Sequence, residues 1–219
     1  MDVMKALVNA GAVDDGSNGN HYVYSSKKHG PAYINMDMLF PKVQVMEQVC
    51  TALAGEFNDE FDTVVGAATG GIPLAALTGY LADAQYALWA DKKASTNKEE
   101  KNFAFERAGF GNVLQGRNVL IVEDLLTTGG TVMKVVEQVR KWHGNVIGVS
   151  CVCNRGGATK ESLGVPRLEA LCSVDFKAYL PEHCLQCIEG VPIVADVGHG
   201  NDFQAENPDY HGGFKTLLS

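Results

Sequence analysis

Residues 118–131, which read NVLIVEDLLTTGGT, limit what this chain can fold into more than any other segment. The segment starts with four consecutive apolar residues at 119–122, a pattern typical of a strand that is buried on both faces of a sheet. A turn rich in Gly and Thr follows, and residues 132–141 carry apolar side chains at helical spacing. A buried strand that leads through a tight turn into a helix indicates an α/β fold with a mostly parallel sheet.

The turn after this strand has the composition of a phosphate-binding loop. Glycines let backbone N–H groups approach an anion closely, hydroxyl groups add donors, and the N-terminus of the following helix carries partial positive charge. The residues that bring these properties are Thr127, Thr128, Gly129, Gly130 and Thr131.

Two adjacent carboxylates, Glu123 and Asp124, stand where we expect the strand to end. Carboxylates do not bind phosphate, but they accept hydrogen bonds from a vicinal diol or bind a hard cation such as Mg²⁺. A phosphate site a short distance from a diol site matches a ribose 5-phosphate. An ordinary turn before a capped helix would need neither paired acids nor so many hydroxyl groups.

Residues 119–131 resemble the phosphoribosyl-pyrophosphate (PRPP) motif of type I phosphoribosyltransferases, which is an apolar strand, two acids, a three-residue spacer and Thr-Gly-Gly-Thr. The resemblance implies a mostly parallel open sheet with helices on both faces. It also implies transfer of the phosphoribosyl group of PRPP, with Mg²⁺, to a nitrogen of a base, and release of pyrophosphate. Glu123 and Asp124 would then hold the ribose hydroxyls and, directly or through water, Mg²⁺, while residues 127–131 would hold the 5-phosphate.

A second turn of similar composition follows another apolar strand, expected at 61–67. It contains Thr69, Gly70 and Gly71, and a helix is expected from Leu74 to Leu81. A strand, a Gly-rich turn and a helix N-terminus again form an anion-binding geometry. In the family that the chain resembles, this turn holds the pyrophosphate of PRPP, although a plain turn would have a similar sequence.

Residues 90–111 are charged and poorly periodic, and their length predicts a lid that closes over the site. Lys92 and Lys93 stand where a basic pair contacts pyrophosphate in the family, and Lys93 is the candidate for catalysis. The family's Lys-x-His-Gly signature is missing, and Lys98 or Lys101 could supply the lysine in its place. The alternative for each lysine is a solvated surface charge.

Residues 26–35 resemble the N-terminal region of orotate phosphoribosyltransferases, which favours orotate as the acceptor base. The segment keeps a Pro and a Tyr, but Ser25 and Asp37 replace the family's Lys and Arg. Lys28 could donate to the base instead, or it could belong to a solvated basic turn. Arg155 follows a further apolar strand at 146–153 and matches the arginine that the family uses for the orotate carboxylate, although Asn154 replaces the acid before it. The alternative for Arg155 is a loop arginine with a surface partner.

The acceptor therefore stays open at this point, and a purine or another pyrimidine is an alternative to orotate. So is a regulator that binds PRPP or a nucleotide without catalysis, since proteins of one fold differ in function. Detectable turnover of PRPP with any base would separate an enzyme from such a regulator.

A chain of 219 residues with 46% hydrophobic residues can bury the core of one domain. We expect a single phosphoribosyltransferase domain, with a core at about 42–172 and a small hood, formed by about 1–41 and 173–219, that covers the base.

The net charge of −8 argues against nucleic acid as a partner. No apolar run has transmembrane length and the N-terminus lacks the pattern of a signal peptide, so we expect a cytoplasmic protein without membrane contact. The family resemblance implies a homodimer.

The six cysteines are scattered and have the pattern of reduced thiols rather than of a disulfide framework. Cys184 and Cys187 form a Cys-x-x-Cys pair with His183 and His199 nearby. One such pair is half of a zinc site, and no second pair follows it. We favour reduced thiols for this pair, and a zinc site or a redox pair stays open.

Overall fold

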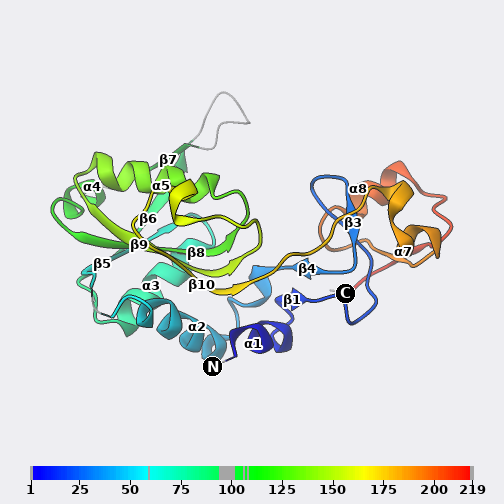
Figure 1. The fold of residues 1–219 in the computed structure, drawn as a ribbon, viewed down its shortest axis with the longest axis horizontal. Helices are drawn as coiled ribbons and strands as arrows, with labels where there is room; N and C mark the ends of the chain where they lie inside the picture. The colour runs from blue at the N-terminus through cyan, green and yellow to red at the C-terminus, as the bar shows by residue number, and fades with distance from the viewer. Residues whose placement is uncertain (1, 59, 94–101, 106, 108, 218–219) are drawn as a thin grey trace. The chain divides into compact units, whose positions relative to one another are not determined.

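The computed structural model describes residues 2–58, 60–93, 102–105, 107 and 109–217, except for the side chains of residues 93 and 102 (Figure 1). The chain forms two compact units. One consists of Met1–Ala6 and Met36–Asp175, and the other of Leu7–Asn35 and Phe176–Ser219. The prediction that the chain ends form a hood over a bound base stays a prediction.

The first unit is built on a six-stranded sheet with the order β10-β9-β8-β5-β6-β7. All neighbouring strands are parallel except β6 and β7, which are antiparallel. The strands are β5 (Thr63–Ala67), β6 (Tyr86–Lys93), β7 (Asn102–Ala104), β8 (Asn118–Leu126), β9 (Asn145–Asn154) and β10 (Leu168–Ser173). This confirms the mostly parallel open sheet predicted from the sequence.

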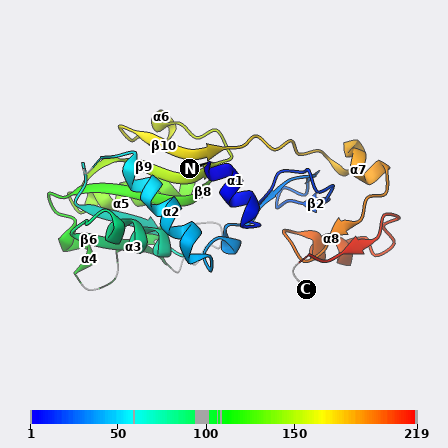
Figure 2. The same cartoon turned by 90° about the horizontal axis from the view of Figure 1, so that it is seen from below.

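Helices cover both faces of the sheet, as predicted (Figure 1). α4 (Phe110–Val113) and α5 (Gly130–Lys141) lie on one face. α2 (Val43–Gly55) and α3 (Gly71–Leu81) lie on the other, and Figure 2 shows them running across the strands. Two shorter helical elements of this unit are the 3-10 turn η1 (Met36–Met38) and α6 (Lys160–Leu163), and α1 (Val3–Asn9) contains residues of both units.

The alternation of side chains along each strand divides the core between these helix layers. Val119 and Ile121 of β8 pack into the same cluster as the four buried valines of α5. Leu120 lies between them in the strand, so it points to the face covered by α2 and α3, and it is fully buried. Burial on both faces explains the uninterrupted apolar run in the sequence.

The boundaries of several elements differ from those predicted. β8 continues to Leu126, so Glu123 and Asp124 lie within the strand and not after its end. The physical reason is its neighbour β9, whose Cys151, Cys153 and Asn154 continue the parallel ladder past the acids.

α3 begins at Gly71 rather than at Leu74. Pro73 lies in the first turn, where a backbone N–H would have no partner inside the helix, so the helix can begin before it. Gly71 also approaches β5 closely: a Cβ atom on it would lie only 2.9 Å from the Cα atom of Gly66. The first residues of the predicted lid at 90–111 belong to β6, so Lys92 and Lys93 lie inside a strand.

The second unit contains only short elements. β1 (Val13–Asp14) pairs with β4 (Tyr33–Ile34), β2 (Tyr22–Val23) pairs with β3 (His29–Gly30), and β11 (Ile193–Val194) pairs with β12 (Phe214–Lys215). The helical elements are η2 (Pro181–His183), α7 (Leu185–Ile188) and α8 (Gly200–Glu206). The unit therefore joins two segments from opposite ends of the sequence with little regular structure.

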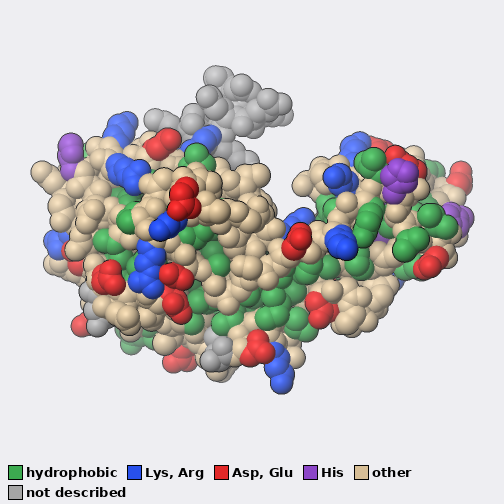
Figure 3. Space-filling view, in the orientation of Figure 1, with side chains coloured by type: hydrophobic (Ala, Val, Ile, Leu, Met, Phe, Trp, Pro, Cys, Tyr) green, Lys and Arg blue, Asp and Glu red, His purple; other side chains and the backbone are tan. Residues whose placement is uncertain are grey.

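On the face of the molecule drawn in Figure 3, Lys and Arg side chains lie among Asp and Glu side chains and do not form a separate patch. Among the described residues, no helix has the length and apolar character that crossing a bilayer requires.

Candidate active site

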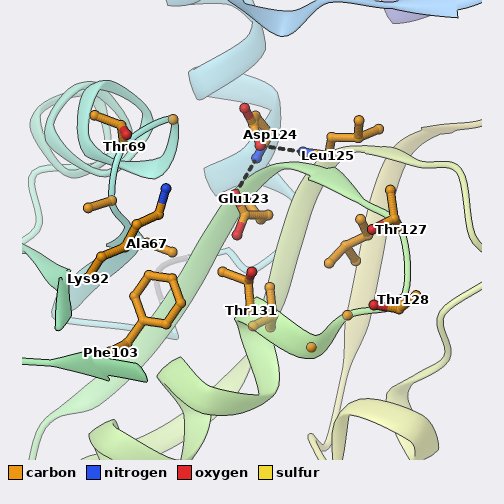
Figure 4. A pocket seen from close by; sticks show the side chains of 16 residues that line it. Ala67, Thr69, Lys92, Phe103, Glu123, Asp124, Leu125, Thr127, Thr128 and Thr131 are labelled. Atoms are coloured by element: carbon orange, nitrogen blue, oxygen red, sulfur yellow. Dashed lines mark hydrogen bonds between the residues drawn. The ribbon is translucent and has the colours of Figure 1, made fainter. Parts of the chain in front are cut away.

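A cavity of about 220 Å³ in the first unit brings most of the predicted PRPP residues together (Figure 4). Its walls come from the C-terminal part of β8 with the turn that follows, from the turn after β5, and from the β6–β7 pair. The predicted residues that line it are Thr69, Gly70, Lys92, Glu123, Asp124, Thr127, Thr128, Gly129, Gly130 and Thr131. Ligands of open α/β sheets bind at this carboxyl edge of the strands.

The turn between β8 and α5 lines one side of the cavity and presents backbone and hydroxyl donors to it. Gly129 caps α5 with φ +76°, a left-handed conformation that favours glycine. A Cβ atom at this position would also collide with the side chain of Leu163. The first N–H groups of α5 have no partner inside the helix, so together with the threonine hydroxyls they suit a phosphate.

The turn after β5 lines the opposite side of the cavity with Thr69 and Gly70 (Figure 4). It is tied to β6 by a hydrogen bond from the N–H of Ala68 to the carbonyl of Ala90, at 3.0 Å. Gly70 lies directly against the carboxylate of Asp124, because a Cβ atom there would be 3.0 Å from Asp124 Cγ and closer still to Oδ2. Gly71 was predicted to line the same site, but it forms the first turn of α3 against Gly66 instead.

The two acids differ in their surroundings although they are neighbours in β8. Glu123 is buried, with 7% of its surface exposed, whereas Asp124 is half-buried. Asp124 Oδ1 accepts a hydrogen bond of 2.7 Å from the N–H of Leu125, which fixes the carboxylate beside Gly70.

Burial, and secondarily the negative charge of Asp124, raise the pKa of the Glu123 carboxyl well above its ordinary value. The positive charge of Lys92 opposes this rise. The cavity therefore favours additional positive charge or hydroxyl donors next to Glu123, and a cation or a sugar diol would supply either.

The β6–β7 pair closes a third side of the cavity. Lys92 and Phe103 are partners in this antiparallel ladder, and both side chains line the cavity (Figure 4). The backbone of Lys93 belongs to β6, but its side chain lies outside the described part of the structure. Lys98 and Lys101 also lie outside the described residues, so their predicted roles stay predictions.

Comparison with known proteins agrees with this geometry. The model of the phosphoribosyl transferase domain family matches residues 42–170. The chain belongs to the phosphoribosyltransferase family. Within this family it is 35% identical over 178 residues to the orotate phosphoribosyltransferase of Caldanaerobacter subterraneus, which covers 81% of this chain and 88% of the relative. The orotate phosphoribosyltransferase of Caldicellulosiruptor bescii is 31% identical over 175 residues, covering 80% of this chain and 86% of the relative.

Solved structures show the same fold. The orotate phosphoribosyltransferase of Aeropyrum pernix superposes with a TM-score of 0.59 at 23% identity and covers 80% of this chain and 94% of its own. These comparisons confirm the resemblance that the PRPP motif indicated, and they identify this phosphoribosyltransferase as an enzyme of the orotate phosphoribosyltransferase type.

Two predicted base-binding residues lie outside the cavity of this phosphoribosyltransferase. Arg155 lines a separate pocket with residues 154–157 and 173–175. Its N–H donates to the carbonyl of Leu126 at 2.8 Å, so the loop after β9 lies beside the end of β8. Asn154 holds this loop, because its side chain exchanges two hydrogen bonds with the backbone of Ala158. Lys28 is exposed in the second unit.

The sequence did not indicate the apolar part of the cavity. Phe103 and Leu125 line it, but neither residue type carries a chemical signal in the sequence. Phe103 is recognised only from the structure, because the antiparallel pairing of β7 with β6 sets it opposite Lys92.

Proposed function

We propose that this phosphoribosyltransferase transfers the phosphoribosyl group of PRPP to orotate, which yields orotidine 5-phosphate and pyrophosphate in pyrimidine biosynthesis. One observation carries the proposal: a single cavity joins the acid pair of β8 to two anion-binding turns and a lysine. PRPP has a diol between two phosphate-bearing ends, and it matches this order of groups. The names of the relatives support orotate as the acceptor.

Each group of the cavity has a proposed role toward PRPP. Residues 127–131 hold the 5-phosphate through backbone N–H groups and hydroxyls. Glu123 and Asp124 accept hydrogen bonds from the ribose hydroxyls. Thr69, Gly70 and Lys92 face the pyrophosphate, and the proposed role of Lys93 is to join them. Gly71 supports this turn by its packing and does not itself line the cavity.

The reaction needs no nucleophile from the protein. The bond between C1 of the ribose and the pyrophosphate oxygen breaks, positive charge develops on the ribose ring, and a nitrogen of the base forms the new bond to C1. Positioning of the sugar and stabilisation of negative charge on the leaving pyrophosphate supply the rate enhancement. Lys92 and the donors of the turn after β5 provide that stabilisation in this proposal.

Mg²⁺ is the proposed cofactor, and the donor set fits it. The cavity offers carboxylate and hydroxyl oxygens, which are the hard ligands that Mg²⁺ prefers. Glu123 and Asp124 would hold the ion directly or through water, and the ion, when bound, neutralises charge on the pyrophosphate. A cation near Glu123 would also offset the unfavourable burial of its charged form.

Arg155 is the proposed partner of the orotate carboxylate. The loop after β9 lies beside the end of β8, which also carries the acid pair, so the arginine is on the same edge of the sheet as the PRPP cavity. A guanidinium group binds a carboxylate in a bidentate geometry. Lys28 is proposed as a further donor to the base.

The assembly and compartment are further proposals. The family resemblance supports a homodimer, which the molecular mass in solution would test. None of the six cysteines forms a disulfide, and free thiols suit the reducing cytoplasm.

Pyrophosphate release from PRPP and Mg²⁺ in the presence of single bases tests the proposed acceptor. Orotate, uracil, adenine, guanine, hypoxanthine and xanthine would be assayed separately, and we expect release with orotate alone. We expect Arg155→Lys to raise KM for orotate while it leaves KM for PRPP unchanged, because Lys cannot form the bidentate contact. Release with a different base would refute orotate as the acceptor and keep the PRPP site.

A further inference from the structure

Four buried side chains of the second unit meet at one point, far from one another in the sequence. His21 precedes β2, His29 begins β3, and Cys184 and Cys187 lie at the start and inside of α7. His21 and His29 have no exposed surface, Cys184 is 1% exposed, and Cys187 is 9% exposed. Their four candidate ligand atoms all lie within 4.8 Å of one another.

The distances within this cluster match the edges of a coordination tetrahedron. His21 Nε2 lies 3.1 Å from His29 Nδ1. Cys187 Sγ lies 3.2 Å from His29 Nδ1 and 3.6 Å from His21 Nε2, and Cys184 Sγ is also 3.6 Å from His21 Nε2. A tetrahedral Zn²⁺ with ordinary bond lengths to S and N has S···N edges of about 3.5 Å and N···N edges of about 3.3 Å. The four measured distances lie close to these values.

A hydrogen bond orients one of the two histidine ligands, whereas the buried Nε2 atom of His29 has no hydrogen-bond partner. His21 Nδ1 lies 3.0 Å from the carbonyl oxygen of Val191, which fixes the proton on Nδ1 and leaves Nε2 as the ligand atom. The hydroxyl of Tyr210 donates to the same carbonyl at 3.0 Å. Metal-bound histidines have partners of this kind on their second nitrogen.

Backbone hydrogen bonds fix the two ligand-bearing segments to each other. His29 and Tyr179 exchange two bonds of 2.7 and 2.9 Å, and the N–H of Val194 donates to the carbonyl of His21. The side chain of Gln186 donates to the carbonyl of Asn20. The ligands are therefore held in place by the fold around them, as a preorganised metal site requires.

The chemistry of the four groups suits a divalent metal. Imidazole nitrogens and thiolate sulfurs are the usual ligands of structural Zn²⁺. Two thiolates would bring two negative charges, which a divalent cation neutralises, and this removes the cost of burying them.

The second unit has little regular structure to stabilise it. Each of its strands has two residues, and one small cluster of buried apolar residues in it consists of Tyr22, Tyr24, Val194 and Val197. Small units with such limited cores usually depend on a disulfide or a structural metal, and no cysteine here forms a disulfide.

We propose that His21, His29, Cys184 and Cys187 bind one structural Zn²⁺ that ties the N-terminal segment of the second unit to its C-terminal segment. Sulfur and imidazole ligands favour Zn²⁺ over Mg²⁺ or Ca²⁺. Four protein ligands complete the tetrahedron and leave no open position for a substrate, so the site is structural and not catalytic. This inference does not rest on the proposed phosphoribosyl transfer.

The sequence pattern favoured reduced thiols for the Cys-x-x-Cys pair, and the histidines near the pair in the sequence are not those of this cluster. His183 and His199 are near the Cys-x-x-Cys pair in the sequence, but both are exposed, and His199 pairs with Asp202 instead. The histidines of this cluster come from the N-terminal segment of the unit. The antiparallel pairing of β2 with β3, and not a sequence motif, brings His21 close to His29.

Metal analysis of the full chain, purified without chelators, tests the proposal. We expect one equivalent of Zn²⁺ per chain. Replacement by Co²⁺ should give the visible bands of tetrahedral cobalt together with a sulfur-to-cobalt charge-transfer band in the near ultraviolet. Cys187→Ser and His29→Ala should lose the bound metal, whereas the controls Cys172→Ser, in β10 of the first unit, and His183→Ala, beside Cys184 but exposed, should keep it.

If His29→Ala does not fold, a second variant that replaces the histidine by another metal ligand still tests the proposal. His29→Cys should still bind one equivalent, and its cobalt derivative should show a stronger charge-transfer band because a third thiolate has been added. Wild-type protein without bound Zn²⁺ and with no charge-transfer band on addition of Co²⁺ would overturn the proposal. So would a wild-type chain in which Cys184 and Cys187 form a disulfide. The metal content and the cobalt spectrum are measured without substrate, so their outcome does not depend on whether the transferase assay succeeds.

Discussion

Gly70→Ala separates the geometry of the candidate site from the stability of the fold. Gly70 has φ −61° and ψ −34°, which alanine adopts without strain, so the backbone can accept the substitution. The new methyl group, however, would lie 3.0 Å from Asp124 Cγ. Because carbon atoms in contact are normally about 3.5–4.0 Å apart, the Asp124 carboxylate must move by roughly 0.5–1 Å.

This displacement sets the expected size of the effect. A misplacement of about 1 Å in a site that acts by positioning can lower the rate on the order of 10²-fold. That corresponds to about 2.7 kcal/mol of lost transition-state stabilisation. The assay is pyrophosphate release at saturating orotate, from which kcat/KM for PRPP is determined.

Gly55→Ala is the matched control, because Gly55 ends α2 and a Cβ atom there would meet nothing within 4 Å. We expect this control to have wild-type kcat/KM, and we expect both variants to melt within a few degrees of wild type. If Gly70→Ala has the wild-type kcat/KM for PRPP, the reasoning that Gly70 and Asp124 jointly shape the site is refuted.

Two further predictions concern stability. The raised pKa of Glu123 means that the folded state holds this proton more tightly than the unfolded state, so wild type loses stability as pH rises from the ordinary glutamate value of about 4.3 toward the raised pKa. Calorimetry without PRPP or Mg²⁺ measures this. The melting temperature of Glu123→Gln should exceed that of wild type by a margin that grows over this pH range. A constant margin would contradict burial as the cause of the raised Glu123 pKa. Leu120→Ala should lower the free energy of unfolding by about 2–5 kcal/mol, because Leu120 is fully buried between β8 and the helices on its face. Urea unfolding monitored by circular dichroism measures this, and a loss well below that range would show that the core at this face of the sheet collapses around the gap.

Much of the PRPP cavity could be predicted because many of the residues that line it are close together in the sequence. Residues 127–131 form one turn, and Glu123 and Asp124 precede it in the same strand. Apolar runs also predicted the parallel sheet, since strands buried on both faces require them. Short-range patterns were sufficient wherever neighbours in sequence are neighbours in the site.

Prediction failed where partners are distant in sequence. The end of β8 was placed too early because its last residues are held by β9 and not by their own composition. Gly71 was assigned to the cavity, but it forms the first turn of α3 and lies against Gly66 of β5, a contact that only the folded backbone reveals. His21 and His29 could not be paired with Cys184 and Cys187 for the same reason.

The measurement that tests the central claim most directly is orotate-dependent release of pyrophosphate from PRPP and Mg²⁺ by wild type and by Asp124→Asn. The matched control is Asp83→Asn, which changes an exposed acid just after α3. The account predicts turnover by wild type and by the control, and a loss of orders of magnitude in Asp124→Asn with a melting temperature that is not lowered. Normal turnover in Asp124→Asn, or no release by wild type with any base, would contradict it.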